Sequence, residues 1–191
     1  CTSLTSVNSG DWELKKVTHM RAAFSDCTSL IAINTTNWNT HRVTNFTAIF
    51  HNCISLTTVD VSNWNFKKAT DIGGMFQNCP SLIELDTSKW DLSNVNGMYY
   101  LFYGCTNLKS VGDTSKWNLS NVTNMQQAFH QCNSLTHLDV ANWDISNMQG
   151  NTMSSFFSGC SSLTELTFPR GKFGIGDVSN AFTNCSNIKN T

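Results

Sequence analysis

Eight cysteines recur along this chain at nearly equal spacing, and thiols can oxidise to disulfides, bind metal ions or act as nucleophiles. They are Cys1, Cys27, Cys53, Cys79, Cys105, Cys132, Cys160 and Cys185, separated by 26, 26, 26, 26, 27, 28 and 25 residues. Such a period stacks equivalent residues on rungs ~4.8 Å apart with parallel side chains, whereas a disulfide needs Cβ atoms that converge to about 4 Å. We therefore predict a buried ladder of reduced thiols instead of a disulfide framework, and no tetrahedral zinc site.

The other reactive side chains do not form a catalytic pattern. The five histidines, His19, His41, His51, His130 and His137, share few columns of the repeat. The sequence contains no nucleophile elbow, zinc-binding motif or phosphate-binding loop. We expect a protein that is not an enzyme and uses no cofactor or metal.

Basic residues form the first column that points to binding. About fourteen residues after the cysteine, the first three repeats carry a basic pair and the next three carry Ser-Asn. The basic pairs are Lys15-Lys16, His41-Arg42 and Lys67-Lys68, and His19, Arg21 and His51 could extend the patch. Like charges stacked ~4.8 Å apart repel, so a chain with only 13% charged residues has little structural reason to gather them. The stripe is a candidate site for an anionic polymer, and the alternative is a solvated turn that tolerates lysine.

A second column is acidic and is predicted to face outward from the strands, on the concave side. It comprises Asp60, Glu84, Asp86, Asp113 and Asp139, with Lys89, Lys116 and His137 partly balancing the charge. Concave faces of repeat arrays often bind proteins. A ladder of carboxylates does not by itself converge on one calcium ion.

Aromatic columns offer two further interpretations. Trp12, Trp38, Trp64, Trp90, Trp117 and Trp143 could stack on sugars, but their inward phase predicts core packing, with each indole N–H closing a turn. The tyrosines Tyr99, Tyr100 and Tyr103 stand together, and the first two are expected on the convex side. There they could bind a partner or pack against a longer loop.

These columns require a stacked array to position them. Residues 56–61 alternate like a short strand, and Thr44 could cap a short helix that runs towards Cys53. The residue before each cysteine, mostly Asn or Gly, should end that helix in a left-handed conformation. Gly112 should absorb the extra residue before Trp117. The sequence predicts an α/β solenoid of about seven repeats, each with one short strand and one short helix or turn.

The pattern Leu56-x-x-Val59-x-Val61-x-x-Trp64-x-Phe66 resembles the leucine-rich repeat frame, with Trp where most such repeats have Asn. The whole unit, as in FQNCPSLIELDTSKWDLSNVNGM (76–98), is similar to the BspA-like leucine-rich repeats of bacterial surface proteins. The resemblance covers nearly the entire chain and implies a surface adhesin for host or matrix components, without shared catalytic residues. We expect one domain, residues 1–191, cut from a longer extracellular protein, with residues 168–191 as an irregular last repeat or cap.

The net charge and the length of the apolar runs limit the classes of binding partner to expect. The formal net charge of −1 does not favour nucleic acid, and no apolar run approaches the ~20 residues of a membrane helix. We expect the basic stripe to bind acidic polysaccharide, host glycan or mucin. Binding should strengthen in acid, because protonating five histidines takes the formal charge from −1 to +4. The alternatives are a protein adhesin that binds a host receptor or matrix protein through the acidic face, and a spacer that displays other domains.

Overall fold

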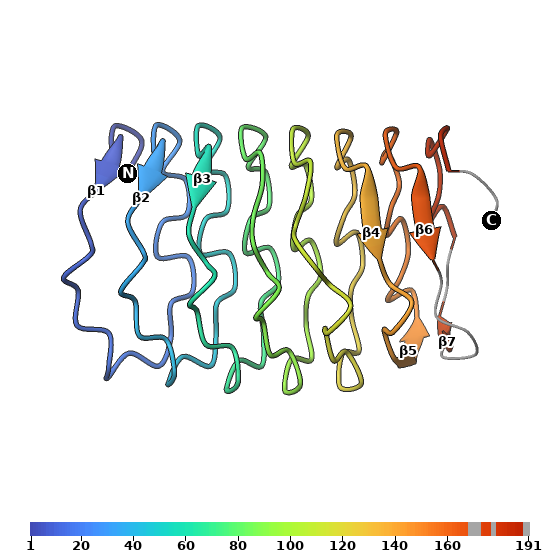
Figure 1. The fold of residues 1–191 in the computed structure, drawn as a ribbon, viewed down its shortest axis with the longest axis horizontal. Coiled ribbons are helices and arrows are strands. Elements are labelled where there is room, and N and C mark those ends of the chain that lie inside the picture. Colours follow the sequence, from blue (N-terminus) through green and yellow to red (C-terminus); the bar gives the residue numbers. More distant parts are fainter. Residues whose placement is uncertain (168–172, 177–178, 189–191) are drawn as a thin grey trace.

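The computed structural model describes residues 1–167, 173–176 and 179–188. Figure 1 shows a row of coils that lie side by side, with the N-terminus near one end and the C-terminus at the other. Each coil is one repeat, numbered here from the cysteine that opens it, so that repeat 1 begins at Cys1 and repeat 7 at Cys160. The predicted solenoid is therefore confirmed. The expected cap at 168–191 lies partly outside the described residues.

Short parallel strands join neighbouring repeats. They are β1 (Ser6–Val7), β2 (Ala32–Ile33), β3 (Thr58–Val59), β4 (His137–Asp139), β5 (Ile145–Gly150), β6 (Glu165–Thr167) and β7 (Phe173–Gly176). The sheets are β1-β2-β3, β4-β6 and β5-β7. Their register pairs residues one repeat apart, as in Ser6 with Ala32 and Ala32 with Thr58. The strand expected over 56–61 is shorter than predicted, because only β3 within it has strand pairing.

The segment that precedes each cysteine is a ladder of turns, and the described residues contain no helix. Between repeats 1 and 2, the N–H groups of residues 20, 22, 24 and 26 donate to the carbonyls of residues 45, 47, 49 and 51. The predicted helix cap at Thr44 is therefore wrong, and its hydroxyl instead donates to the Thr18 carbonyl of the preceding repeat at 3.1 Å. Of the predicted "helix or turn", the turn is correct, because inter-repeat hydrogen bonds replace the bonds of a helix.

Left-handed residues make this ladder possible. The residue before each cysteine from Cys27 onward has positive φ, for example Asp26 at 58° and Asn52 at 62°, which confirms the prediction. A second left-handed residue stands four places earlier in each repeat, at Ala22 (54°), Ala48 (56°) and their equivalents, and the sequence did not indicate it. Gly112, at φ 79°, absorbs the extra residue of its repeat as expected. Hydrogen bonds along the ladder offset the conformational cost, which is about 1–2 kcal/mol for a residue with a Cβ.

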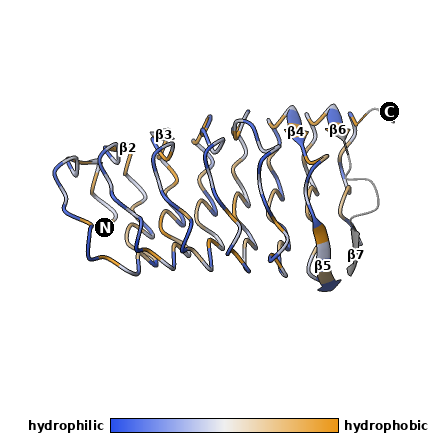
Figure 2. Cartoon of the chain, turned by 60° about the horizontal axis from the view of Figure 1, so that its bottom comes forward, coloured by the Kyte–Doolittle hydropathy of each residue, from blue (hydrophilic) through white to orange (hydrophobic). Residues whose placement is uncertain are grey.

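Aromatic columns fill the core. The Phe column stacks from Phe24 to Phe182 with ring centroids 5.3–5.8 Å apart. The tryptophans of repeats 2 to 6 are each 2% exposed, which confirms core packing, whereas Trp12 is 44% exposed. Four of these indoles, Trp38, Trp90, Trp117 and Trp143, donate to a backbone carbonyl of the preceding repeat, as predicted. The Trp64 indole N–H has no such partner. Figure 2 shows the resulting alternation of hydrophobic and hydrophilic stretches along the coils.

The cysteine column completes the core. All eight thiols are free, and Cys27 to Cys160 are buried whereas Cys1 is exposed. Six of them donate to the carbonyl of a column phenylalanine, as Cys53 does to Phe24 at 3.1 Å and Cys105 to Phe76 at 3.0 Å. Burial raises the pKa of Cys53 and of Cys105 to about 12, so these thiols stay protonated and unreactive at neutral pH. The predicted structural role of the thiols agrees with this geometry.

Candidate functional site

The basic pairs lie along one edge of the solenoid, which we call the turn edge. It consists of one residue pair from each of repeats 1 to 6: Lys15-Lys16, His41-Arg42, Lys67-Lys68, Ser93-Asn94, Ser120-Asn121 and Ser146-Asn147. The last pair lies in β5, which marks the lower edge in Figure 1. All six side chains of the three basic pairs are exposed. The structure thus brings these predicted site residues into one row on consecutive turns.

In repeats 2 to 6 the turn is held by a side-chain oxygen two residues before it. Asn39 and Asn65 accept the backbone N–H of His41 and Lys67 at 3.4 and 3.0 Å. Asp91 accepts that of Ser93 at 3.1 Å, and Asn118 and Asp144 do the same in repeats 5 and 6. This arrangement fixes the backbone whatever side chain follows, because Asx turns need only the oxygen acceptor. The turn therefore does not require the basic residues.

The two halves of the turn edge differ in how their side chains are tied down. In the amide half, repeats 4 to 6, each Asn donates its Nδ2–H to a carbonyl of the preceding repeat. Asn94 donates to Lys67 at 2.8 Å, and Asn121 donates to Ser93 at 2.7 Å. In the basic half, repeats 1 to 3, no side chain of the pairs makes this bond among the described residues. The amide half is a locked ladder, whereas the basic half leaves its cations facing solvent.

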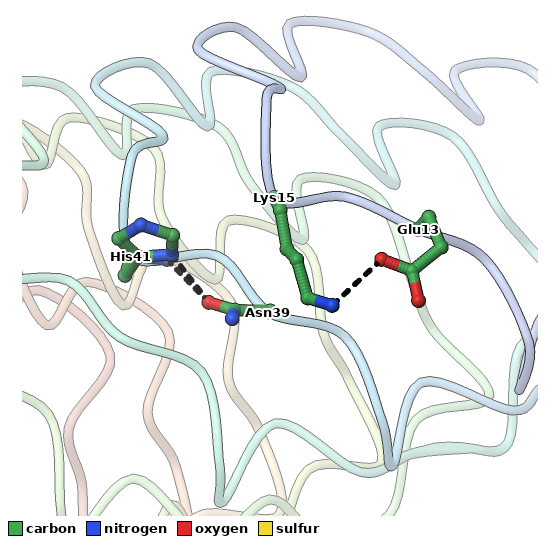
Figure 3. Close-up of polar contacts among 4 residues, drawn as sticks. All are labelled: Glu13, Lys15, Asn39 and His41. Carbon is green, nitrogen blue, oxygen red and sulfur yellow. Dashed lines mark hydrogen bonds and ion pairs between the residues drawn. The ribbon is translucent and has the colours of Figure 1, made fainter.

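Few acids neutralise the basic half. Lys15 Nζ lies 3.1 Å from Glu13 Oε2 in an exposed ion pair, and His41 Nδ1 contacts Asn39 Oδ1 at 2.5 Å. Figure 3 shows that both contacts stay within their own turns. Within the described residues, Lys16, Arg42, Lys67 and Lys68 have no ion pair. Four permanent positive charges therefore remain available on three adjacent rungs.

A shallow groove begins where the two halves meet. It has a volume of about 550 Å³, and we call it the amide groove; its lining residues are Thr44, Lys67, Lys68, Thr70, Asn94, Asn96 and Asn121. A smaller depression of about 290 Å³ flanks Lys67 on the opposite side and includes Lys89 and Asp91. The sequence did not indicate this groove, because its lining comes from two columns, Asn94 with Asn121 and Thr44 with Thr70 and Asn96, which meet only when neighbouring turns are placed together.

The three residues expected to extend the stripe lie on the turn ladder that follows the turn edge in each repeat. His19 pairs by its backbone with Asn45 at the start of the turn ladder, and Arg21 follows two residues later. His51 lies at the far end of the same ladder, where its ring is 3.3 Å from the Ser25 hydroxyl. The turn positions themselves are occupied by Lys15, Lys16, His41, Arg42, Lys67 and Lys68, which form the basic row.

The acidic column has a local structural role. Asp60, Asp86, Asp113 and Asp139 each accept a backbone N–H two residues later at 2.9–3.0 Å. Hydrogen bonds from Ser88 and from Ser115 lower the pKa of Asp86 and of Asp113. Asn34 fills the same position in repeat 2 with the same bond, so the turn needs an oxygen and not a charge. Glu84, Lys89 and Lys116 are exposed nearby, and exposed His137 lies 3.5 Å from Glu165 across β4 and β6.

The tyrosines lie on the turn ladder and are half-buried. Tyr99 covers Gly73, where an added Cβ would come within 2.5 Å of the phenol ring, and its hydroxyl lies 3.4 Å from Asp71. Burial, and then the Asp71 carboxylate, raise the pKa of Tyr99. Tyr99 therefore packs on glycine backbone and not against a longer loop. Tyr103 stacks on His130 at 5.0 Å, a neighbour that the shared column of the two residues could have revealed.

Two classes of site have no geometric support in the described part of the chain. No three His, Cys, Asp or Glu side chains there come close enough to hold a metal ion. No helix there is long and apolar enough to cross a membrane.

The parallel strands and stacked columns define a leucine-rich repeat solenoid. The chain resembles the crystal structure of a leucine-rich repeat protein from T. pallidum, with a TM-score of 0.63 and 19% identity over 91% of this chain and 72% of that one. A leucine-rich cell surface protein from Faecalibacterium prausnitzii gives a TM-score of 0.48 and 18% identity, over 100% of this chain and 60% of that one. At these identities the first match shows the fold alone. No curated protein sequence matches this chain significantly.

The particular family is shown by sequence. The model of the family described as "Mycoplasma protein of unknown function, DUF285" matches residues 1–113 and again 81–191. The two matches together span the whole chain. This protein belongs to that family, which is more specific than the leucine-rich repeat class.

Proposed function

We propose that this chain is a non-enzymatic binding module of a bacterial surface protein, and that the basic half of its turn edge holds an anionic polysaccharide. The observation that carries the proposal is the row of exposed cations on three consecutive turns, of which only Lys15 has an ion-pair partner among the described residues. The resemblance to BspA-like surface repeats supports the surface location.

The geometry favours a linear, repeating ligand. Rungs ~4.8 Å apart present charge at regular intervals along one edge, and a polymer can contact several rungs at once. The individual contacts are solvent-exposed, so each is weak and sensitive to salt. Affinity would come from their number, and binding should therefore fall steeply as ionic strength rises.

Acid should strengthen binding mainly through one residue. Of the histidines, only His41 lies on the turn edge, between the Lys15-Lys16 and Lys67-Lys68 rungs. A protonated imidazole at this position would add one cation to the row. The gain at low pH should therefore be modest and should disappear in His41→Gln.

The test is binding to acidic and neutral polysaccharides at pH 5 and pH 7.4, across a salt series. Wild type is compared with Lys67→Ser/Lys68→Asn, which installs the residues that the amide half already uses. The matched control is Lys109→Ser/Lys116→Ser, which removes two exposed cations away from the turn edge. We expect the first variant to lose about tenfold in affinity for acidic polymers and the control to lose little.

Equal losses in the two variants would contradict a localised site, because net charge alone would then explain binding. Failure of wild type to bind any acidic polymer would contradict the proposal itself. In that case the strand face around Glu84 and Lys89 becomes the surface to test against protein receptors, as a salt-tolerant interface.

A further inference from the structure

We infer that the amide groove recognises an acidic sugar residue followed by neutral ones, so that the ligand is a heteropolysaccharide with charge on only some of its residues. The inference rests on the proposed function and deepens it by naming the class of ligand. The groove has a volume of about 550 Å³ and is lined by lysine, asparagine and threonine side chains, which carry the hydrogen-bonding groups that sugars require.

One end of the groove suits an anion. Lys67 and Lys68 are exposed, adjacent in sequence and without an ion pair within the described residues. Two ammonium groups can approach a carboxylate or sulfate from two sides and donate charge-assisted hydrogen bonds. This end would hold the acidic residue of the polymer.

The other end suits hydroxyl groups. Asn94 and Asn121 each donate Nδ2–H to a backbone carbonyl, so the amide oxygen of each side chain is directed away from that carbonyl. Thr44 and Thr70 likewise donate their hydroxyl hydrogens to carbonyls of the preceding repeat at 3.1 and 3.2 Å. The lone pairs that remain are acceptors held in fixed positions. Sugar hydroxyls are the donors that match them.

The charge pattern along the edge disfavours an anion on the next rung. The turn edge carries no cation after Lys68. Lys89 and Asp91 both line the depression on the opposite flank and not the amide groove. A carboxylate placed on repeat 4 would meet the amide oxygen of Asn94 with no cation beside it, whereas a hydroxyl could donate to that oxygen. A pyranose residue is close in length to one rung, so the sugar after the acid should be neutral.

The test compares two acidic polymers of matched length at 0.15 M salt. One alternates glucuronate with N-acetylglucosamine, and the other, polygalacturonate, is acidic at every residue. We expect wild type to bind the alternating polymer about fivefold more tightly, although it carries fewer charges. Asn94→Lys should abolish this preference by favouring polygalacturonate, and the column already accepts lysine at residue 68.

A second variant tests the acceptor end without adding charge. Asn96 is exposed, and its side chain makes one 3.3 Å hydrogen bond, to the Asn121 carbonyl, while its backbone bonds do not depend on the side chain; Asn96→Ala should therefore fold normally, as circular dichroism would check. The variant should bind the alternating polymer about threefold more weakly and bind polygalacturonate with unchanged affinity. Equal wild-type affinity for the two polymers, with no selective loss in Asn96→Ala, would overturn the inference and leave the basic site standing. No binding of either polymer would instead overturn the proposed function.

Discussion

The two halves of the turn edge rest on one continuous core, and the turns of repeats 2 to 5 share the same Asx hydrogen bond, yet the two halves use their exposed positions differently. In repeats 4 to 6 each turn ends in an asparagine that bonds to the preceding repeat, as Asn94 does to the Lys67 carbonyl. In repeats 1 to 3 the equivalent positions are Lys16, Arg42 and Lys68, which make no such bond among the described residues. In the amide half every turn is hydrogen-bonded to the preceding repeat through its asparagine, and in the basic half no side chain of the pairs makes this bond among the described residues.

This difference distinguishes side chains that stabilise the edge from side chains that are left available to a ligand. One intramolecular hydrogen bond contributes about 0.5–1.5 kcal/mol, so each basic position forgoes a stabilising contact that its neighbours show to be possible. Stacked cations add repulsion to that loss. Residues kept at a site where a more stabilising residue fits are candidates for function, and this argument applies to Arg42 and Lys68 but not to the Asp column, whose side chains hold turns.

The largest predicted effect tests whether the two halves share one core. The buried thiols have raised pKa values in the folded protein, about 12 for Cys105 against 9.0 for an ordinary thiol. Because the pKa is raised in the folded protein, the stability that the protonated thiol contributes is complete below about pH 9 and is lost as pH rises towards 12. At pH 10, Cys105 alone should lower the free energy of unfolding by about 1.4 kcal/mol, and the other buried cysteines of the column should lower it further.

Urea unfolding followed by tryptophan fluorescence at pH 8, 9 and 10 measures this effect, because tryptophans lie in both halves. We expect one transition whose free energy falls by several kcal/mol. Cys105→Ala serves as the control, since its stability should depend less on pH by about 1.4 kcal/mol at pH 10. A free energy that stays constant from pH 8 to pH 10 would contradict the buried thiol ladder.

Much of the core could be predicted from the sequence because the period places like residues together. Phe, Cys and Trp recur in phase, and columns of a solenoid stack, so their burial followed directly. The helix prediction was wrong because Phe46, Ile49 and Phe50 fit the inward positions of a helix and of a turn ladder equally well. The left-handed Ala22 and Ala48 carry no sequence signal, since alanine rarely adopts that conformation.

The candidate site was predictable only as a list of charges. The sequence placed Lys15 to Lys68 on equivalent turns, and it grouped His19, Arg21 and His51 with them because it does not show where the turn edge ends and the turn ladder begins. The amide groove depends on which carbonyl each asparagine reaches, and that requires the positions of two neighbouring turns. The Asp column looked like a binding surface because the sequence does not show that each carboxylate accepts a backbone N–H within its own turn.

A mutation at the junction between the halves should have the next largest effect. Phe66 is 1% exposed, and its ring centroid lies 6.2 Å from that of Trp64, 4.4 Å from that of Trp90 and 4.7 Å from that of Phe46. It therefore connects repeats 2, 3 and 4. Phe66→Ala should destabilise the protein by about 3–5 kcal/mol, because the cavity would remove ring contacts on both sides.

The solenoid is held by contacts between neighbouring repeats, so this cavity should also reduce cooperativity. We expect urea unfolding of Phe66→Ala to broaden or split, with the basic half unfolding separately. Leu119→Ala, in the equivalent column of repeat 5, is the control for a cavity inside one half. A loss below about 1 kcal/mol in Phe66→Ala would show that the aromatic cluster does not hold the junction.

The smallest effect is also the most direct test of the comparison. Lys68→Asn places an amide where Asn94 and Asn121 stand in later repeats, and its Nδ2–H should reach the carbonyl of His41. The variant should gain about 0.5–1.5 kcal/mol of stability while it loses affinity for acidic polymers. Lys68→Ala, which cannot form the bond, should stay within about 0.5 kcal/mol of wild type. Urea unfolding measures both, and an asparagine variant no more stable than the alanine variant would mean that the amide ladder does not stabilise the edge and that the basic residues forgo nothing.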